Sequence, residues 1–316
     1  MTSLAADIGG TYSRLAWLED CRPKAEQVFG NAEFDSLEAV IECGQERLGI
    51  KGCTLDQMVL ALPGPVQRDP IELTNIQWQL RREALRDRFH VNRLTIVNDF
   101  QAAALGAVNE PYEHLMVLNR VSPGEGPVVV TGAGTGLGMA WLAQRDQAAL
   151  PQATEGGHLD FAPNNTDQVD LYRWLAERYG HVSYERILSG DGLLNTYAWL
   201  AGNGAQAQTP AEVAALAAAG DAHATAAIAQ FIAIFGAYAG SLALAFNPTG
   251  GLYLCGGLTA HLATFFETTA FMAAYAAKGR MGDVVRQIPV YLVTRPNTGL
   301  TGAIQIAKRN GSSPWA

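Results

Sequence analysis

Short apolar runs that stop at glycine, proline or asparagine recur along this chain of 316 residues. Runs of this length, bounded by turn-forming residues, are typical of buried β-strands. The pattern predicts strands in seven segments, namely 4–8, 15–18, 58–62, 94–97, 128–131, 139–142 and 252–255. The first two segments flank one glycine-rich turn, and the fifth and sixth flank another. This repeated unit of strand, glycine turn and strand indicates two related lobes.

Helical spacing of apolar residues marks much of the rest. Asp35 or Ser36 can cap a helix whose apolar face carries Leu37, Val40, Ile41 and Leu48. Helical patterning also dominates residues 167–246. Strands, glycine turns and helices mixed in this way indicate α/β architecture. Because a domain usually has ~100–200 residues, the length predicts two lobes around one cleft. A new group of strands starts near Met116, which puts the lobe boundary near residue 108.

Charge and cysteine content exclude several classes of function. With 22 basic and 30 acidic residues the net charge is −8, so the molecule as a whole does not attract nucleic acid or anionic lipid. The four cysteines form no C-x-x-C pair and no zinc-type spacing with histidine, which indicates free thiols in a reducing cytoplasm. The chain opens without the basic and apolar regions of a signal peptide, so secretion is not expected.

One uncharged stretch, Ala226–Phe246, has the length of a membrane span. Gln230, Tyr238 and Ser241 interrupt it, and it is rich in alanine and lacks basic flanks. These features favour a buried interior helix.

The first glycine turn reads Asp7-Ile-Gly-Gly-Thr11 and follows a predicted strand. Backbone N–H groups of successive glycines can approach phosphate oxygens closely, because no Cβ atom intervenes. The turn has no lysine, and the pattern of a Walker A loop occurs nowhere in the chain. A plain β-turn is the alternative for this motif taken alone.

The second glycine turn, Gly132-Ala-Gly-Thr-Gly-Leu-Gly138, has glycine at every second position. That spacing differs from the G-x-G-x-x-G pattern of a dinucleotide site, so a Rossmann fold is disfavoured. A second phosphate-binding hairpin, to which Thr135 adds a hydroxyl donor, is one interpretation. A flexible surface turn is the other.

Asn98-Asp99 ends an apolar strand and precedes the probable helix start Ala102-Ala103-Ala104. Carboxylates at such strand ends project into the clefts where α/β proteins bind ligands. Asp99 can therefore be a general base, although an aspartate that caps the following helix is the more ordinary explanation.

Three further motifs suit a sugar pocket. Glu155-Gly-Gly-His158 offers an acceptor and a switchable donor around a glycine pair, and sugar hydroxyls both donate and accept. A metal site there is disfavoured, because no cysteine or second histidine lies nearby. Glu185 is expected on a short helix capped by Ser183, where sequence alone indicates an exposed glutamate. Asn75-Ile-Gln-Trp78 suits the polar edge and apolar face of a pyranose, or is simply surface.

Seven motifs in one order resemble the bacterial glucokinase family, the zinc-free branch of the hexokinase, Hsp70 and actin superfamily. They are Asp7-Ile-Gly-Gly-Thr11, Thr74-Asn75-Ile-Gln-Trp78, Asn98-Asp99-Phe100, Gly132-Ala-Gly-Thr-Gly136, Glu155-Gly-Gly-His158, Glu185 and Leu254-Cys-Gly-Gly257. The similarity runs from about Ala5 to Ala307. The cysteine-rich zinc motif of the related repressor, open-reading-frame and kinase group is missing.

The resemblance implies an α/β, two-lobed actin-like ATPase fold of the ribonuclease H-like kind, with a five-stranded mixed sheet in each lobe and a cleft between them. Residues 1–108 with 297–316 would form the small lobe, and 109–296 the large lobe. The implied activity is transfer of the ATP γ-phosphoryl group to the 6-hydroxyl of glucose, with Mg²⁺ and without zinc. A cytoplasmic homodimer is implied, with no nucleic-acid or membrane partner.

The resemblance also assigns roles to residues. Asp99 would be the catalytic base and a sugar contact, and Asp7 would orient a Mg²⁺-bound water. The other sugar ligands would be Asn75, Asn98, Glu155, His158 and Glu185. The ATP contacts would be Ala6, Asp7, Ile8, Gly9, Gly10, Thr11, Gly132, Ala133, Gly134, Thr135, Gly136, Gly256 and Gly257.

Three other functions stay open beside this one. A kinase for another hexose would use most of the same hydroxyl contacts. A sugar-sensing regulator without catalysis would need a DNA-binding helix-turn-helix, and Asp7 leaves no room for one before it, while the intact Asn98-Asp99 pair favours an enzyme. An Hsp70-like chaperone would need a peptide-binding domain after the nucleotide-binding part.

Overall fold

The computed structural model describes residues 1–74, 76–144 and 150–311, and the chain divides into two compact units. Unit 1 comprises Met1–Glu110 together with the segment from Asn297 onward. Unit 2 comprises Pro111–Pro296. Each unit contains its own sheet and its own hydrophobic core.

Unit 1 is built on a five-stranded mixed sheet with the strand order β3-β2-β1-β4-β7. Antiparallel pairing joins β1 to β2 and β2 to β3, whereas β1, β4 and β7 run parallel. The strands are β1 (Thr2–Ile8), β2 (Tyr12–Glu19), β3 (Arg22–Gly30), β4 (Leu55–Leu62) and β7 (Val91–Asn98). A small hairpin pairs β5 (Ile71–Glu72) with β6 (Gln79–Leu80). The sheet matches the five mixed strands that the resemblance implies for the small lobe.

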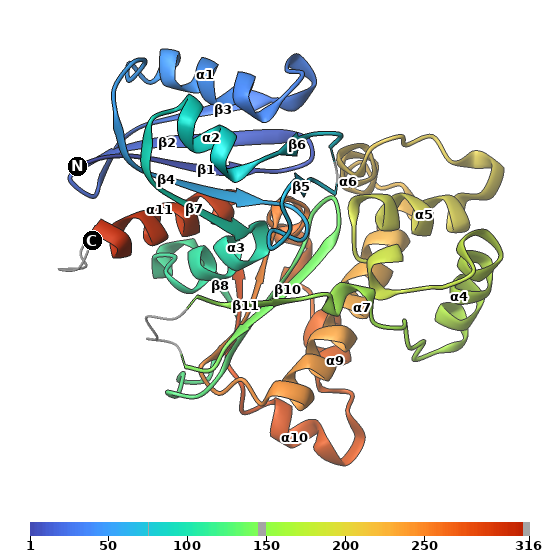
Figure 1. The fold of residues 1–316 in the computed structure, drawn as a ribbon. Helices are drawn as coiled ribbons and strands as arrows, with labels where there is room; N and C mark the ends of the chain where they lie inside the picture. The colour runs from blue at the N-terminus through green and yellow to red at the C-terminus, as the bar shows by residue number, and fades with distance from the viewer. Residues whose placement is uncertain (75, 145–149, 312–316) are drawn as a thin grey trace. The chain divides into compact units, whose positions relative to one another are not determined.

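Helices cover both faces of this sheet (Figure 1). On one face lie α1 (Leu37–Arg47) and α2 (Arg82–Arg88), and on the other α3 (Asp99–Val108) and α11 (Thr298–Gly311). Ser36 caps α1 by accepting a hydrogen bond from the Ala39 N–H at 3.2 Å, which confirms one of the two predicted caps. The apolar face of α1 is buried as its spacing predicts. The single-turn helix η1 (Asn31–Glu33) follows β3.

Two glycines let α3 and α11 pack with their backbones in contact. A side chain at Gly106 would overlap the Thr298 carbonyl, and one at Gly302 would overlap the Ala102 carbonyl. The Gln57 side chain adds a hydrogen bond of 2.7 Å from Nε2 to the Ala307 carbonyl. The segment after unit 2 is thereby fixed to the sheet and to the helix that follows Asp99.

The sheet of unit 2 has six strands, in the order β11-β10-β9-β12-β13-β8. They are β8 (Leu115–Asn119), β9 (Val128–Ala133), β10 (Leu137–Leu142), β11 (Gln152–Thr154), β12 (Gly251–Cys255) and β13 (Val290–Val293). The resemblance implied five strands for the large lobe, and that number is wrong by one. The additional strand, β11, has three exposed residues at the sheet edge, so no apolar run marks it in the sequence.

The core of unit 2 surrounds α7 (Ala222–Phe246), which packs against α5 (Gly190–Ala201), α6 (Pro210–Ala218) and α9 (Ala270–Ala276) (Figure 1). This helix is long and apolar enough to cross a membrane, but 72% of its most apolar window is buried within the protein. The predicted interior helix is confirmed. Gly236 and Gly240 face the backbone carbonyls of Phe271 and Tyr275 with no room for a side chain.

Shorter helices complete unit 2. The α-helices are α4 (Thr166–Tyr179), α8 (Gly257–His261) and α10 (Gly282–Val285). The 3₁₀ helices are η2 (Tyr112–His114), η3 (Gly156–His158), η4 (Tyr184–Arg186), η5 (Gly202–Gly204), η6 (Ala263–Glu267) and η7 (Gly279–Met281). All seven strands predicted from apolar runs are present, and each is longer than predicted by one to four residues.

Candidate functional site

The first glycine turn joins β1 to β2 and is held from one side by Asn31. The Gly9 N–H donates to the Tyr12 carbonyl at 2.9 Å, which closes the turn. Asn31 Nδ2 donates to the Gly9 carbonyl at 2.7 Å, and its Oδ1 accepts from the Ser13 hydroxyl at 2.6 Å. Asn31 is only 3% exposed, so this network is shielded from water. Sequence reasoning missed Asn31, because no spacing rule links residue 31 to a turn twenty residues earlier.

Asp7 lies just before this turn, and its side chain is largely buried, with 14% exposed. It pairs across the strands with Arg14, whose Nη1 lies 4.0 Å from Asp7 Oδ2. The backbone of Gly299, in the first turn of α11, packs directly against the carboxyl group. Burial raises the pKa of Asp7 to about 6, and the Arg14 guanidinium offsets part of that increase.

The neighbours Asn98 and Asp99 have different structural duties. Asn98 is the N-cap of α3, because its Oδ1 accepts hydrogen bonds from the N–H groups of Phe100 and Gln101, at 2.9 and 3.3 Å. The Gln101 side chain completes a capping box by accepting from the Asn98 N–H at 3.1 Å. Asn98 and not Asp99 is therefore the N-cap residue, although Asp99 Oδ1 also accepts from the Phe100 N–H at 2.8 Å. Asp99 is the first helical residue, where the helix dipole favours a charged carboxylate.

The second glycine turn joins β9 to β10 and is held by neighbours in unit 2. The Gly134 N–H donates to the Gly136 carbonyl at 2.8 Å, and the Gly190 N–H donates to the Gly134 carbonyl at 2.9 Å. The buried Thr259 hydroxyl accepts from the Ala133 N–H at 3.2 Å. A side chain at Gly134 would meet nothing within 4 Å, so the middle of the turn is open to a ligand.

The glycines at the end of β12 lie against this second turn. The parallel strands β9 and β12 end together, with Cys255 opposite Gly132. A side chain at Gly132 would overlap the Cys255 carbonyl, and one at Gly256 would overlap the Ala133 carbonyl. Gly256 also has φ +98°, which only glycine adopts readily. The structure thus brings together two sets of predicted ATP contacts, Gly132–Gly136 and Gly256–Gly257.

Three predicted sugar ligands gather beside the same turn. Glu185 Oε2 accepts from the Leu137 N–H at 2.9 Å, directly after the second glycine turn. His158 lies between two carboxylates, with Nδ1 3.9 Å from Glu185 Oε1 and Nε2 3.9 Å from Glu155 Oε2. The Gly156-Gly157 pair allows this approach, because Gly157 packs against the Leu137 carbonyl. The carboxylates of Glu155 and Glu185 and the imidazole of His158 therefore lie next to the second glycine turn.

Glu185 departs from its sequence-based description. It lies on η4 as predicted, but the Ser183 side chain makes no capping hydrogen bond. The Glu185 side chain is 31% exposed and bound to the backbone, so it is not simply a surface glutamate. A side chain at Gly136 would come within 2.6 Å of Glu185 Oε2, so the glycine leaves room for the Glu185 carboxylate.

The predicted residues fall into one set in each unit. Unit 1 carries Ala6–Thr11, Asn98 and Asp99, and unit 2 carries the remaining positions except Asn75. Asn75 lies outside the described residues. Ala6 and Ile8 are fully buried in β1, where they pair with residues of β2. Among residues 1–74, 76–144 and 150–311, no group of three or more His, Cys, Asp and Glu side chains could hold a metal ion by itself.

Comparisons with known proteins show the family of the chain. Residues 4–310 match the Glucokinase family. A glucokinase of Marinobacter nauticus is 38% identical over 313 residues, which cover 96% of each chain. The chain belongs to the glucokinase family.

Solved structures of similar proteins confirm the fold. The glucokinase of an Antarctic psychrotroph superposes with a TM-score of 0.81 at 29% identity, covering 98% of this chain and 99% of that one. A ROK family glucokinase from Streptomyces griseus, in complex with glucose and AMPPNP, gives a TM-score of 0.65 at 16% identity, covering 97% and 99%. The mixed sheets and helices are those of the two-lobed, actin-like sugar kinases, as the glucokinase motifs imply.

Proposed function

We propose that this protein is an ATP-dependent glucokinase that transfers the γ-phosphoryl group of ATP to the 6-hydroxyl of glucose, giving glucose 6-phosphate and ADP. Membership of the glucokinase family supports this activity. Units 1 and 2 would be the small and large lobes.

The observation that carries the proposal is that Asn98 is the N-cap of α3, whereas Asp99 is the first residue of that helix. Asn98 and Gln101 form the capping box of α3, and the Asp99 carboxylate lies beside it, with Oδ1 accepting from the Phe100 N–H at 2.8 Å. The end of β7 fixes the backbone of Asp99, and the helix N-terminus favours its charged form. An ionised carboxylate of fixed position is what a general base requires.

In the proposed reaction Asp99 accepts the proton of the sugar 6-hydroxyl while that oxygen attacks the γ-phosphorus. Phosphoryl transfer leaves little covalent chemistry to the protein, so the remaining residues position the reactants and balance charge. Glu155, His158 and Glu185 would bind sugar hydroxyls in unit 2, and Asn98 would contribute through its amide N–H, since its Oδ1 caps α3. Asn75 completes the proposed sugar set.

The backbone N–H groups of the two glycine turns would bind the phosphates. They belong to residues 6–11 and 132–136, and Gly256 and Gly257 would lie beside the adenosine. The open middle of the second turn suits this role.

The residues present fit a Mg²⁺ ion that arrives with ATP. The lone carboxylate of Asp7 beside the first turn is the kind of ligand that Mg²⁺ uses together with phosphate oxygens and water. When bound, Mg²⁺ neutralises charge on the β- and γ-phosphates. Asp7 would orient a water of its coordination shell, and no zinc is expected.

We further infer a cytoplasmic location and a homodimer. Four free cysteines suit a reducing compartment. The dimer is supported only by the resemblance to the family.

Replacement of Asp99 tests the proposal. Asp99→Asn should keep sugar affinity, measured by calorimetric titration with glucose, but lose about 10²–10⁴-fold in kcat, the usual contribution of a general base. Asp35→Asn is the matched control, because Asp35 is an exposed aspartate of the same unit. Near-normal kcat in Asp99→Asn would refute the role of Asp99. No sugar-dependent ADP release by the unaltered protein, screened over several hexoses, would refute the activity.

A further inference from the structure

A cleft of about 350 Å³ lies between α2 and β7, on unit 1. The residues that line this α2–β7 cleft are Arg82, Glu83, Arg86, Asn92, Arg93 and Leu94. None of them belongs to the proposed sugar or nucleotide sites. The cleft borders the edge of the sheet, because β7 is the last strand in the order. Its volume suits a small organic ligand.

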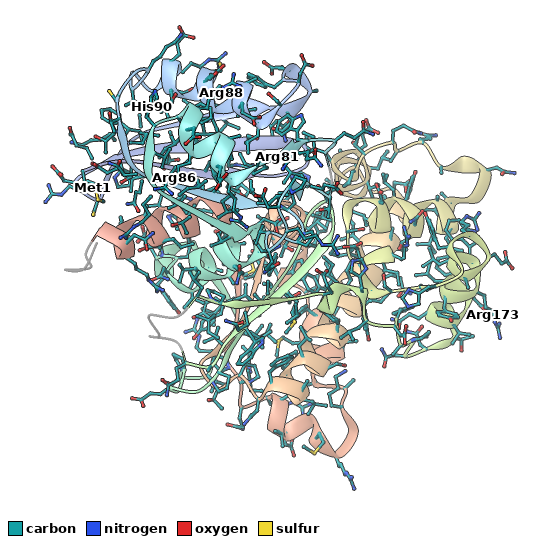
Figure 2. The ribbon with its side chains drawn as sticks, in the orientation of Figure 1. Met1, Arg81, Arg86, Arg88, His90 and Arg173 are labelled. Atoms are coloured by element: carbon teal, nitrogen blue, oxygen red, sulfur yellow. The ribbon has the colours of Figure 1, made fainter. Side chains whose placement is uncertain are left out.

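The cleft is basic on a molecule that is acidic overall. Residues 81–93 contain five arginines and two carboxylates, although the whole chain carries a net charge of −8. Figure 2 shows Arg81, Arg86, Arg88 and His90 around α2. The charge of Arg88 is neutralised, since its Nη2 lies 2.7 Å from Glu42 Oε1.

The three arginines of the lining are not neutralised in this way. Within the part of the chain that the structure describes, Arg82, Arg86 and Arg93 form no ion pair. Glu83 is the one carboxylate of the lining. Three guanidinium charges and one carboxylate leave the α2–β7 cleft with a formal charge of +2.

Backbone carbonyls hold these three side chains in place. Arg82 donates to the Val66 carbonyl, Arg86 Nη2 to Asn92 at 3.4 Å, and Arg93 Nη1 to Asn310 at 3.3 Å. Such bonds fix a guanidinium group without cancelling its charge. Each guanidinium has five N–H donors, so most donors of the three groups are left for a ligand. Positions set in advance lower the entropic cost of binding.

We propose that the α2–β7 cleft binds a small phosphomonoester dianion. A phosphomonoester carries about −1.5 to −2 charges at pH 7, which matches the formal charge of the lining. Planar guanidinium groups bind phosphate oxygens through paired hydrogen bonds, which lysine cannot form. The side chain of Leu94 and the remaining volume would accommodate the carbon skeleton. This site is additional to the proposed phosphate turns.

Calorimetric titration with glycerol 3-phosphate tests the site, at constant ionic strength and with the proposed active site saturated by glucose, Mg²⁺ and a non-hydrolysable ATP analogue. We expect saturable binding of one ligand per chain. Arg86→Ala should weaken it about tenfold, as expected for a charge-assisted hydrogen bond. Arg173→Ala is the matched control, because Arg173 is an exposed arginine of unit 2 that pairs with Asp170 at 3.0 Å (Figure 2). The affinity of Arg173→Ala for glycerol 3-phosphate should equal that of the unaltered protein.

A second titration, with inorganic phosphate, separates the two sources of the same anion. Tighter binding of glycerol 3-phosphate shows that the organic part is held, whereas equal binding shows a site for free phosphate; both support the anion site. Arg86→Lys keeps the charge and loses the paired donors, so it should bind more weakly than the unaltered protein and carries the test if Arg86→Ala does not fold. The absence of saturable binding, or equal affinity in the Arg86 variants and the unaltered protein, overturns the proposal.

Discussion

Replacing Asp7 by asparagine should make the protein more stable at neutral pH. The carboxyl group is buried against Arg14 and Gly299, and burial raises its pKa to about 6 from 3.8. An asparagine of nearly equal size stays neutral at every pH. It therefore avoids the desolvation of a charge that the Arg14 guanidinium, 4.0 Å away, offsets only in part.

The magnitude follows from proton linkage. A group whose pKa is higher in the folded state binds its proton more tightly there, so its stabilising contribution is complete below about 3.8 and is lost as the pH rises through about 6. A shift of about two units corresponds to about 3 kcal/mol at 1.36 kcal/mol per unit. The free energy of unfolding of Asp7→Asn should equal that of the unaltered protein near pH 3.8 and be about 3 kcal/mol higher at pH 7.5.

Urea unfolding between pH 4 and 7.5, without nucleotide and with EDTA to remove Mg²⁺, measures this difference. Asp283→Asn is the control, because the Asp283 side chain is 95% exposed and is not expected to change the pH dependence. The reasoning is refuted if the free energies of unfolding of Asp7→Asn and the unaltered protein differ by the same amount at every pH from 4 to 7.5. In the proposed function the same variant would also lose turnover, so stability would be gained at the expense of activity.

Three further substitutions test the packing and the site. Gly302→Ala should destabilise the protein by about 1–3 kcal/mol in urea unfolding, since its methyl group overlaps the Ala102 carbonyl, and a loss within 0.5 kcal/mol would contradict the close packing of α3 and α11. Asn31→Ala leaves the Ser13 hydroxyl and the Gly9 carbonyl without a partner, so we expect a loss of about 1–3 kcal/mol and a higher KM for ATP. An unchanged KM would show that Asn31 does not position the first turn. Glu185→Ala should raise the KM for glucose about tenfold with a smaller change in the KM for ATP, and an unchanged steady-state KM for glucose would remove Glu185 from the sugar site.

Local patterns in the sequence predicted much of the fold. Each apolar run that stopped at a turn residue became a strand, because a buried strand needs both features within a few residues. The same reasoning identified the interior helix α7, most of whose apolar residues are buried. The strands β3 and β13 lie outside the seven predicted segments, and so does the edge strand β11. Pairing to β10 stabilises the three exposed residues of β11, which leave no apolar pattern in the sequence.

The candidate site also has parts that the sequence predicts and parts that it does not. The glycine turns and the Asn98-Asp99 pair are contiguous, so they can be recognised along the chain. The supports of the turns are not contiguous, because Asn31, Thr259 and Gly299 reach them only through the tertiary fold. Asn98 rather than Asp99 caps α3. Residue type alone could not predict which of the two is the cap, because asparagine and aspartate are both favoured at that position.

The contact between Gly106 and Gly302 has a consequence for biosynthesis. Helix α3 belongs to the first third of the chain, whereas α11 follows the whole of unit 2. At about 5–20 residues per second, translation of unit 2 takes on the order of 10–40 seconds. During that time the face of the sheet that α11 later covers, including Asp7, is incomplete. We therefore expect unit 1 to reach its native structure only after α11 has been synthesised, whereas unit 2, which is continuous in sequence, does not depend on that helix.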